Sequence, residues 1–468
     1  MLREENYLLR RIKSFHCIGI GGTGLSGISE VLKSLGYVVT GSDILKTKVT
    51  DRLISKGIQV YIGHAASNLE NVDAVIYSSA IGADNVELKF AKESRIPTIP
   101  RAQMLAELMR FNHGIAIAGT HGKTTTTSLI STVLADGGKD PTFIVGGIIK
   151  GVDANARLGK GEYLVVEADE SDGSFLRLSP LMAVLTNVDR DHLENFDDNF
   201  ALLHNCFKEF LLRLPFYGIA FVCFDDPNAM SIAKELNANV ITYGMNPGAD
   251  YVATNLEHSD GFEIFNLRFD NQCHKIKLHL SGIHNVQNAL AAIAVARELE
   301  ISIEDIKTSL ENFKGIDRRC QVYENQTIEK KTCTIIDDYG HHPEEVKMVI
   351  STIRRRWPDS RLVVIFQPHR YTRTNDLFED FVEVLSQVDY LILLEIYAAG
   401  EKFIKGADSR SLAKAIRSRG RVEPIFVPRI ASLQNVLKDA VEEGDLVAFL
   451  GAGDVGKVVE NLTRLKRL

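Results

Sequence analysis

The segment that most restricts the fold of this chain runs from residue 115 to residue 125, where apolar residues lead into Gly119-Thr120-His121-Gly122-Lys123-Thr124-Thr125. This order predicts a buried strand, a glycine turn and the start of a helix, as in a phosphate-binding loop. Backbone N–H groups and the helix N-terminus would face an anion, Lys123 would supply a positive charge, and Thr124 would reach a phosphate-bound Mg2+. We therefore expect an ATP site here rather than an incidental glycine turn.

The spacing of this loop departs from the common G-x-x-x-x-G-K-[ST] pattern, because Ile117 stands where the first glycine would be. The nearest preceding glycine is Gly119, only three residues before Gly122. This spacing predicts a tighter loop than usual, and it indicates a particular branch of ATP-using enzymes rather than motors or GTPases in general.

Length and charge limit the class of protein. A chain of 468 residues is longer than one hydrophobic core usually supports, so we expect two to four domains. The net charge of −7 argues against binding to nucleic acid, which generally needs a basic face. It leaves anionic substrates open, because a site can be basic within an acidic protein.

The sequence also predicts a cytoplasmic protein with no membrane partner. No apolar stretch approaches the ~18–20 residues that a membrane span needs. The first 13 residues carry charges of both signs and lead into a strand, unlike a signal peptide. The six cysteines are scattered without a C-x-x-C pair, and several lie in apolar segments. We therefore expect buried free thiols in a reducing compartment.

Apolar and helical segments alternate along the chain, which predicts an α/β fold with parallel sheets. We expect three domains: a Rossmann-like N-terminal domain over 1–112, a central P-loop ATPase-like α/β domain over 113–315, and a C-terminal Rossmann-like α/β domain over 316–468. Residues 251–280 alternate in a way that indicates antiparallel strands inside the central domain. The other expected strands are 15–21, 37–39 with its end at 41–43, 74–78, 142–145, 163–167, 183–187, 219–224, 334–338, 362–366, 390–394 and 446–450.

A second glycine loop lies near the start of the chain, where Gly19, Gly21 and Gly24 fit G-x-G-x-x-G and Asp43 follows 19 residues after the last of them. This pattern is typical of a dinucleotide site, and by itself it suggests an NAD enzyme. The pattern indicates only that a diphosphate binds at a helix N-terminus and that an acidic residue accepts a hydrogen bond from a ribose. A nucleotide-sugar diphosphate would fit such a site equally well. Because an ATP-type loop follows in the same chain, we favour a substrate diphosphate.

Two acidic segments follow apolar strands in the central domain, at residues 167–172 and 186–192. Carboxylates at the ends of neighbouring strands are where a phosphate-loop fold needs a Mg2+ ligand. Solvated acidic loops and structural histidines are the common alternatives. Their position after apolar strands favours a metal-binding role for the carboxylates of residues 167–172 and for His192.

Further candidate residues lie at a helix start and at two strand ends of the third domain. Within residues 282–288, Asn285 and Asn288 are equally suited to capping a helix and to contacting a nucleotide. Residues 337–343 and 366–373 each follow an apolar strand, where open α/β sheets bind ligands. His369, Arg370 and Arg373 concentrate positive charge there, which suits a carboxylate or phosphate better than an incidental basic surface cluster.

Taken together, these motifs resemble the Mur ligase family over essentially the whole chain. Several of them in the family's order are far more specific than any one alone. The motifs that carry the resemblance are residues 19–27, 78–81, 119–125, 167–172, 191–192, 282–288, 318–319, 338–343 and 367–374.

The resemblance implies an ATP-dependent ligase that joins L-alanine to the lactyl carboxylate of UDP-N-acetylmuramate, forming an amide through an acyl phosphate and releasing ADP and phosphate. This reaction belongs to cytoplasmic peptidoglycan precursor synthesis for the cell wall. The implied partners are UDP-N-acetylmuramate, L-alanine and MgATP, with Mn2+ as an alternative to Mg2+, and the expected state is a monomer or a homodimer.

The resemblance also implies a role for each matching residue. The diphosphate substrate would be bound by Gly21, Gly22, Thr23, Gly24, Ser26, Gly27, Ser42, Asp43, Ser78, Ser79 and Arg101. ATP would be bound by Gly119, Thr120, His121, Gly122, Lys123, Thr124, Thr125, Asn285, Asn288, Arg319 and Asp337, and the metal by Thr124, Glu167 and His192. The amino acid would be bound by Tyr339, His341, His369, Arg370 and Arg373, and the catalytic set would be Lys123, His192, His341, His369 and Arg373.

Three alternatives stay open at this point. A family member that joins a recycled tripeptide to the same sugar nucleotide would share most of these motifs. A nicotinamide-dependent oxidoreductase would use the first glycine loop, but it would leave Lys123, Glu167 and the third domain unexplained. A non-catalytic nucleotide-binding scaffold is disfavoured because so many candidate catalytic residues coincide.

Overall fold

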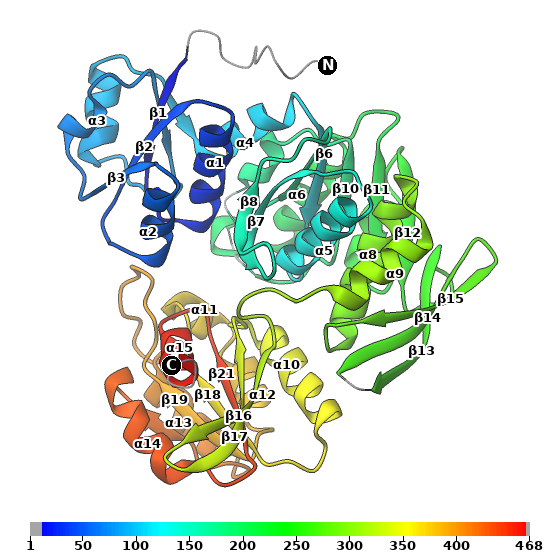
Figure 1. Cartoon of the computed structure of the whole chain (residues 1–468). Helices are drawn as coiled ribbons and strands as arrows, with labels where there is room; N and C mark the ends of the chain where they lie inside the picture. The colour runs from blue at the N-terminus through cyan, green and yellow to red at the C-terminus, as the bar shows by residue number, and fades with distance from the viewer. Residues whose placement is uncertain (1–11, 172, 192, 198, 260, 465–468) are drawn as a thin grey trace. The chain divides into compact units, whose positions relative to one another are not determined.

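The computed structural model describes residues 12–171, 173–191, 193–197, 199–259 and 261–464. Its contacts divide the chain into two compact units. Unit 1 comprises residues 1–279 and 285–314, and unit 2 comprises residues 280–284 and 315–468. Figure 1 labels the helices and strands of both units. The domain boundaries given above stay predictions.

Unit 1 begins with a five-stranded parallel sheet in the order β3-β2-β1-β4-β5. Alternating strands and helices predict this arrangement, because a parallel pair needs a crossover connection. β1 ends at Ile18, earlier than expected, since Gly19 turns the chain with a φ of +80°. The strands are β1 (Ser14–Ile18), β2 (Val38–Asp43), β3 (Gln59–Ile62), β4 (Ala74–Tyr77) and β5 (Thr98–Pro100).

The second sheet of unit 1 has ten strands in the order β15-β14-β13-β12-β11-β10-β6-β9-β7-β8. Its central strands are parallel, and β13, β14 and β15 form the antiparallel segment expected over 251–280. The strands are β6 (His113–Ala118), β7 (Thr142–Ile149), β8 (Ala154–Arg157), β9 (Tyr163–Glu167), β10 (Met182–Leu185), β11 (Ile219–Cys223), β12 (Asn239–Gly244), β13 (Tyr251–Ser259), β14 (Phe262–Phe269) and β15 (Gln272–Leu278).

Helices cover these sheets with their apolar sides. Leu25, Ile28 and Leu32 of α1 are buried, and α5 packs against β6, β7 and β9 (Figure 1). The helices are α1 (Thr23–Ser34), α2 (Lys48–Ser55), α3 (Val86–Glu93), α4 (Arg101–Met109), α5 (Lys123–Asp136), α6 (Phe200–Leu211), α7 (Pro227–Ala233), α8 (Ile283–Glu298) and α9 (Ile303–Asn312).

Unit 2 contains a six-stranded sheet in the order β16-β17-β21-β18-β19-β20, parallel except for β16. Apolar residues of β18 and β21 form the centre of its core, as their continuous apolar sequences predict. The strands are β16 (Gln321–Ile328), β17 (Lys331–Asp338), β18 (Leu362–Phe366), β19 (Tyr390–Leu394), β20 (Ile425–Val427) and β21 (Leu446–Leu450). The helices are α10 (Pro343–Arg356), α11 (Tyr371–Asp376), α12 (Phe378–Leu385), α13 (Ser409–Ser418), α14 (Leu433–Ala440) and α15 (Val455–Arg464).

Two expectations about the chain as a whole can be compared with the structure. Among the described residues, no helix is both long enough and apolar enough to cross a membrane. Cys17, Cys223 and Cys333 are buried free thiols, as their apolar surroundings in the sequence predict.

Candidate active site

The phosphate-type loop lies between β6 and α5 of unit 1, in the place that the sequence predicts. Gly119 and Gly122 have φ angles of +134° and +82°, which L side chains rarely adopt. A Cβ on Gly119 would lie 2.0 Å from Oγ1 of Thr186, so the loop also lacks space for a side chain there. The tight spacing therefore rests on glycine at both positions.

Lys123 begins α5 and turns its ammonium group back into the loop. Its Nζ donates to the carbonyl oxygens of Gly119 at 2.7 Å and Thr120 at 3.1 Å, and to Oε1 of Glu170 at 2.8 Å. Burial acts to lower the pKa of Lys123, but the nearby carboxylates, led by Glu170, outweigh it and raise that pKa. Lys123 is therefore held as a cation. Glu170 is a partner that sequence reasoning did not single out from the acidic segment.

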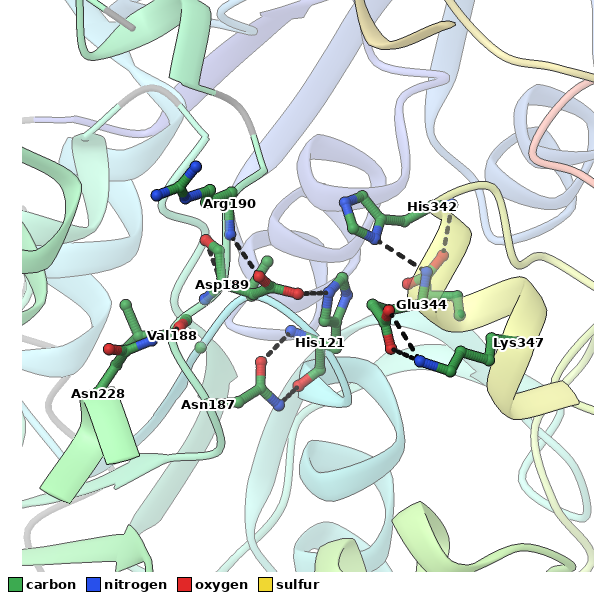
Figure 2. A network of polar contacts seen from close by, with 12 residues as sticks. His121, Asn187, Val188, Asp189, Arg190, Asn228, His342, Glu344 and Lys347 are labelled. Carbon is green, nitrogen blue, oxygen red and sulfur yellow. Dashed lines mark hydrogen bonds and ion pairs between the residues drawn. The ribbon is translucent and has the colours of Figure 1, made fainter. Parts of the chain in front are cut away.

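Asn187 fixes the middle of the loop, as Figure 2 shows. Its Oδ1 accepts a hydrogen bond from His121 N at 2.8 Å, and its Nδ2 donates to His121 O at 3.0 Å. Thr186 Oγ1 donates to the same carbonyl at 2.7 Å, and Asp189 N donates to Thr120 Oγ1 at 2.9 Å. The residues that follow β10 thus hold the loop's backbone, whereas the sequence pattern drew attention only to the acids and the histidine there.

Thr124 and Glu167 lie together beside the loop, because the Thr124 hydroxyl donates a hydrogen bond to Oε1 of Glu167. Glu167 is the last residue of β9, next to β6 in the sheet, and its Oε2 lies 2.3 Å from where a Cβ on Gly146 would be. A hydroxyl and a carboxylate oxygen are ligands that Mg2+ accepts, so this pair fits the expected metal. His192, the third proposed ligand, lies outside the described residues.

Asn288 joins the loop from α8. Its Oδ1 accepts from Thr126 Oγ1 at 3.1 Å, its Nδ2 donates to Oδ1 of Asn285 at 3.2 Å, and it lies against Gly122. The structure therefore places Asn285 and Asn288 at the start of α5. The sequence alone did not decide whether these asparagines cap a helix or contact a nucleotide.

The first glycine loop connects β1 to α1. Gly21 N donates to Oδ2 of Asp43 at 2.9 Å, so the acid at the end of β2 braces the loop. A Cβ on Gly24 would lie 2.3 Å from Nη1 of Arg101, which places that guanidinium directly over the loop. Nη2 of Arg101 also lies 3.4 Å from Oδ2 of Asp169, in the acidic segment that contains Glu170.

The remaining residues expected at this loop lie around it. Ser26 is buried, and its Oγ accepts from Nδ2 of Asn155 at 3.4 Å, while the same amide donates to Thr23 O at 2.9 Å. Gly22 precedes α1 as its N-cap, and a Cβ on Gly27 would meet Ile144 at 3.0 Å. Ser78 and Ser79 follow β4, where Cβ of Ser78 lies close to Gly19.

A buried polar network holds Ser42, the residue before Asp43. The Ser42 hydroxyl donates to Oε2 of Glu87, a fully buried residue of α3. Oε2 of Glu87 also lies 3.0 Å from Nδ1 of His64, and Oε1 accepts from Nδ2 of Asn68 at 2.7 Å. Oε1 lies 3.6 Å from Nε2 of His16. Nothing in the local sequence pattern predicted this network, because its members come from separate segments.

In unit 2, two arginines lie over one aromatic ring. The guanidinium carbons of Arg318 and Arg319 lie 5.2 and 5.5 Å from the ring centroid of Tyr339. Arg318 also pairs with Asp337 at 3.2 Å. Burial, only partly offset by Arg318, raises the pKa of Asp337 to about 6. The structure thus brings Arg319 and Asp337, which were expected to bind ATP, close to Tyr339, which was expected to bind the amino acid.

The histidines expected to bind the amino acid also lie near one another in unit 2. The ring centroids of His341 and His369 are 5.6 Å apart. His342 caps α10, accepting from Glu344 N at 3.3 Å (Figure 2). Arg370 lies 3.8 Å from Glu401, which also accepts from the Thr372 hydroxyl at 2.8 Å.

Arg373 is buried, and its Nη1 donates to His369 O at 3.4 Å. Residues 369–373 therefore form one polar patch at the end of β18, where the sequence predicted a ligand site. Glu401 is an anchor of this patch that sequence reasoning missed.

Comparison with known proteins identifies the family of this chain. The Mur ligase family catalytic domain matches residues 14–113, the Mur ligase middle domain matches 117–296, and the Mur ligase glutamate ligase domain matches 318–453. A UDP-N-acetylmuramate–L-alanine ligase of Xylella fastidiosa is 51% identical over 463 residues, covering 98% of this chain and 97% of the relative.

Solved structures agree as well. The UDP-N-acetylmuramate-alanine ligase of Thermotoga maritima is 28% identical, with a TM-score of 0.83 and coverage of 97% of this chain and 99% of that one. A murein peptide ligase of Psychrobacter arcticus has a TM-score of 0.72 at 21% identity, covering 97% and 98% of the two chains, a likeness that shows the fold alone. The chain belongs to the Mur ligase family. It is therefore an ATP-dependent ligase with three α/β domains, as the sequence predicted.

Proposed function

We propose that this protein joins L-alanine to the lactyl carboxylate of UDP-N-acetylmuramate in an ATP-dependent step of peptidoglycan precursor synthesis. The observation that carries the proposal is the placement of two nucleotide-type loops in one compact unit. The first, braced by Asp43, suits the diphosphate of the sugar nucleotide, and the second, containing Lys123, suits ATP. The names of the highly similar relatives support the choice of substrates.

The reaction follows from the charges in these sites. The substrate carboxylate attacks the γ-phosphorus of ATP, forming an acyl phosphate and releasing ADP. The amine of alanine then attacks the acyl carbon, the amide bond forms, and phosphate leaves from the tetrahedral intermediate. Lys123 acts on the first step by positioning and neutralising the transferring phosphoryl group.

Thr124 and Glu167, with His192 as a further candidate, would hold Mg2+, or Mn2+ in its place, beside the phosphates. When bound, this ion supplies positive charge that stabilises the phosphoryl group during transfer. In unit 1, Gly119 to Thr125 would surround the phosphates, and Asn285 and Asn288 would lie near the adenine.

Unit 2 supplies the residues proposed for the amino acid. The guanidinium groups of Arg370 and Arg373 suit its carboxylate, because a planar guanidinium can bind a carboxylate through two parallel hydrogen bonds. His341 or His369 would accept a proton from the incoming ammonium group. Tyr339 would contact the amino acid, while Arg319 and Asp337 would contact the nucleotide. We also propose a cytoplasmic protein that acts as a monomer or a homodimer.

The direct test is to measure ADP release by the purified protein with MgATP, UDP-N-acetylmuramate and L-alanine, omitting one substrate at a time. The proposal expects sustained, multiple-turnover ADP release only with all three substrates, and a product heavier than the sugar nucleotide by one alanine residue. ADP release without the sugar nucleotide, or no product of that mass, would contradict it. The murein peptide ligase alternative would give product only with the tripeptide.

A further inference from the structure

Glu170 stands out among the acids near the loop because of its contact with Lys123. Both carboxylate oxygens of Glu170 lie 2.8 Å from Nζ of Lys123. The side chain of Glu170 is only 2% exposed, and that of Lys123 is 18% exposed. An ammonium group has three N–H donors. Two carbonyl oxygens of the loop and this carboxylate occupy them all.

We propose that Glu170 is a positioning residue for phosphoryl transfer, which holds the Lys123 ammonium in the loop and balances its charge. This inference rests on the proposed function, because it concerns the lysine that would contact ATP. Glu170 acts through Lys123 and is not itself required to touch the nucleotide.

Two other carboxylates of the same segment, those of Glu167 and Asp169, have different partners. Glu167 accepts the hydrogen bond from Thr124, and Asp169 lies beside Arg101 at 3.4 Å. The main chain of Glu170 is also fixed, because its carbonyl oxygen accepts a hydrogen bond from Gly173 N at 2.9 Å. Glu167, Asp169 and Glu170 thus contact three different groups, and Glu170 contacts the lysine.

This arrangement predicts opposite effects on binding and on catalysis. In Glu170→Gln, the loop loses a negative charge next to Lys123, so the phosphates meet a more positive site and bind more tightly. The amide is a weaker partner for the ammonium, so Lys123 is held less firmly where the transferring phosphoryl group needs it. We therefore expect the affinity for a non-hydrolysable ATP analogue to rise about threefold or more while kcat falls about tenfold or more.

The experiment measures binding of that analogue with Mg2+ by titration calorimetry, together with kcat, in the full chain and in Glu170→Gln. Glu162→Gln is the matched control, because Glu162 lies exposed before β9 and pairs with His113 at 3.8 Å. We expect this control to leave both quantities unchanged. A merely structural role for Glu170 would lower affinity and kcat together.

Two outcomes would overturn the inference. Weaker analogue binding in Glu170→Gln that is recovered at high Mg2+ would make Glu170 a metal ligand instead, and unchanged binding and kcat would leave it without a role. If Glu170→Gln fails to fold, Glu170→Asp, which keeps the charge on a shorter side chain, should retain normal analogue affinity with reduced kcat. Any other pattern in that variant would contradict the inference. Absence of analogue binding to the unmodified protein would instead refute the proposed function.

Discussion

The imidazole ring of His369 stacks on the ring of Tyr397, with centroids 5.4 Å apart and planes inclined by 9°. The main chain reinforces this pair, since Arg370 N donates to Tyr397 O and Tyr397 N donates to Pro368 O, both at 2.9 Å. Arg370 has a φ of +71°, an uncommon conformation for a residue other than glycine. Tyr397 therefore orients a proposed alanine-binding histidine and the strained turn beside it.

Replacing Tyr397 with Leu should weaken alanine binding, because the ring that orients His369 is lost. An aromatic pair contributes about 0.5–1.5 kcal/mol, which corresponds to an increase of about two- to tenfold in KM for L-alanine. Tyr397→Phe keeps the ring and should behave like the unmodified protein. Steady-state kinetics with saturating MgATP check this, and an unchanged KM in the Leu variant would count against the role of His369.

Replacing Asn187 with Ala should impair the ATP site, because both main-chain groups of His121 lose their amide partner. Removing one partner of a buried hydrogen bond costs about 1–3 kcal/mol, so KM for MgATP should rise about tenfold. Asn112→Ala is a suitable control, because Asn112 lies before β6, while the loop follows that strand. Equal KM values in the two variants would show that the loop does not depend on Asn187.

Replacing Lys123 with Ala should abolish phosphoryl transfer while binding of the UDP substrate survives. The loss removes the cation that neutralises the phosphoryl group, so we expect kcat to fall by about a hundredfold or more. ADP release and calorimetric binding of UDP-N-acetylmuramate measure the two effects separately. Substrate-dependent ADP release near the normal rate would mean that this loop has been misassigned.

The network around Glu87 should make stability depend on acidity. Burial acts to raise the pKa of Glu87, but hydrogen bonds from His16, Ser42 and Asn68 outweigh it and lower the pKa to about 2. A carboxyl group whose pKa is lowered by folding stabilises the folded state above its unfolded pKa of about 4.3. That contribution is lost as the pH falls toward 2.

Glu87→Gln should therefore be less stable than the unmodified protein at pH 7, on the order of 3 kcal/mol. This difference should shrink as the pH approaches 3, because Glu87 becomes protonated in the unfolded chain and more of its contribution is lost. Urea unfolding of both proteins at pH 7 and pH 3 measures the difference. A difference in the free energy of unfolding that stays the same at both pH values would contradict the lowered pKa of Glu87.

The sequence predicted the parts of the fold that depend on local patterns. Strands such as β9 and β18 have the predicted bounds, because short apolar runs between turns indicate buried parallel strands. β10 is an instructive difference, since it ends at Leu185 rather than at Asn187. Thr186 and Asn187 leave the strand to hydrogen-bond the loop, which apolar periodicity cannot reveal.

The candidate site was predictable where a motif carries its own chemistry, and less so where partners meet only in the folded chain. The lysine of the loop was evident from its glycines, and the match of Thr124 with Glu167 followed from strand order. Glu170 belonged to an acidic run whose members look equivalent in sequence. Its pairing with Lys123 depends on how the segment turns after β9, which is a property of tertiary structure.

The central claim is that the protein adds L-alanine to UDP-N-acetylmuramate, and amino-acid choice tests it most directly. Phosphate release should be measured with MgATP, UDP-N-acetylmuramate and, in separate reactions, L-alanine, glycine, L-serine or the tripeptide L-alanyl-γ-D-glutamyl-meso-diaminopimelate. We predict the highest kcat/KM with L-alanine and negligible release with the tripeptide. Release that is fastest with the tripeptide, or that is independent of any added amino acid, would contradict the account.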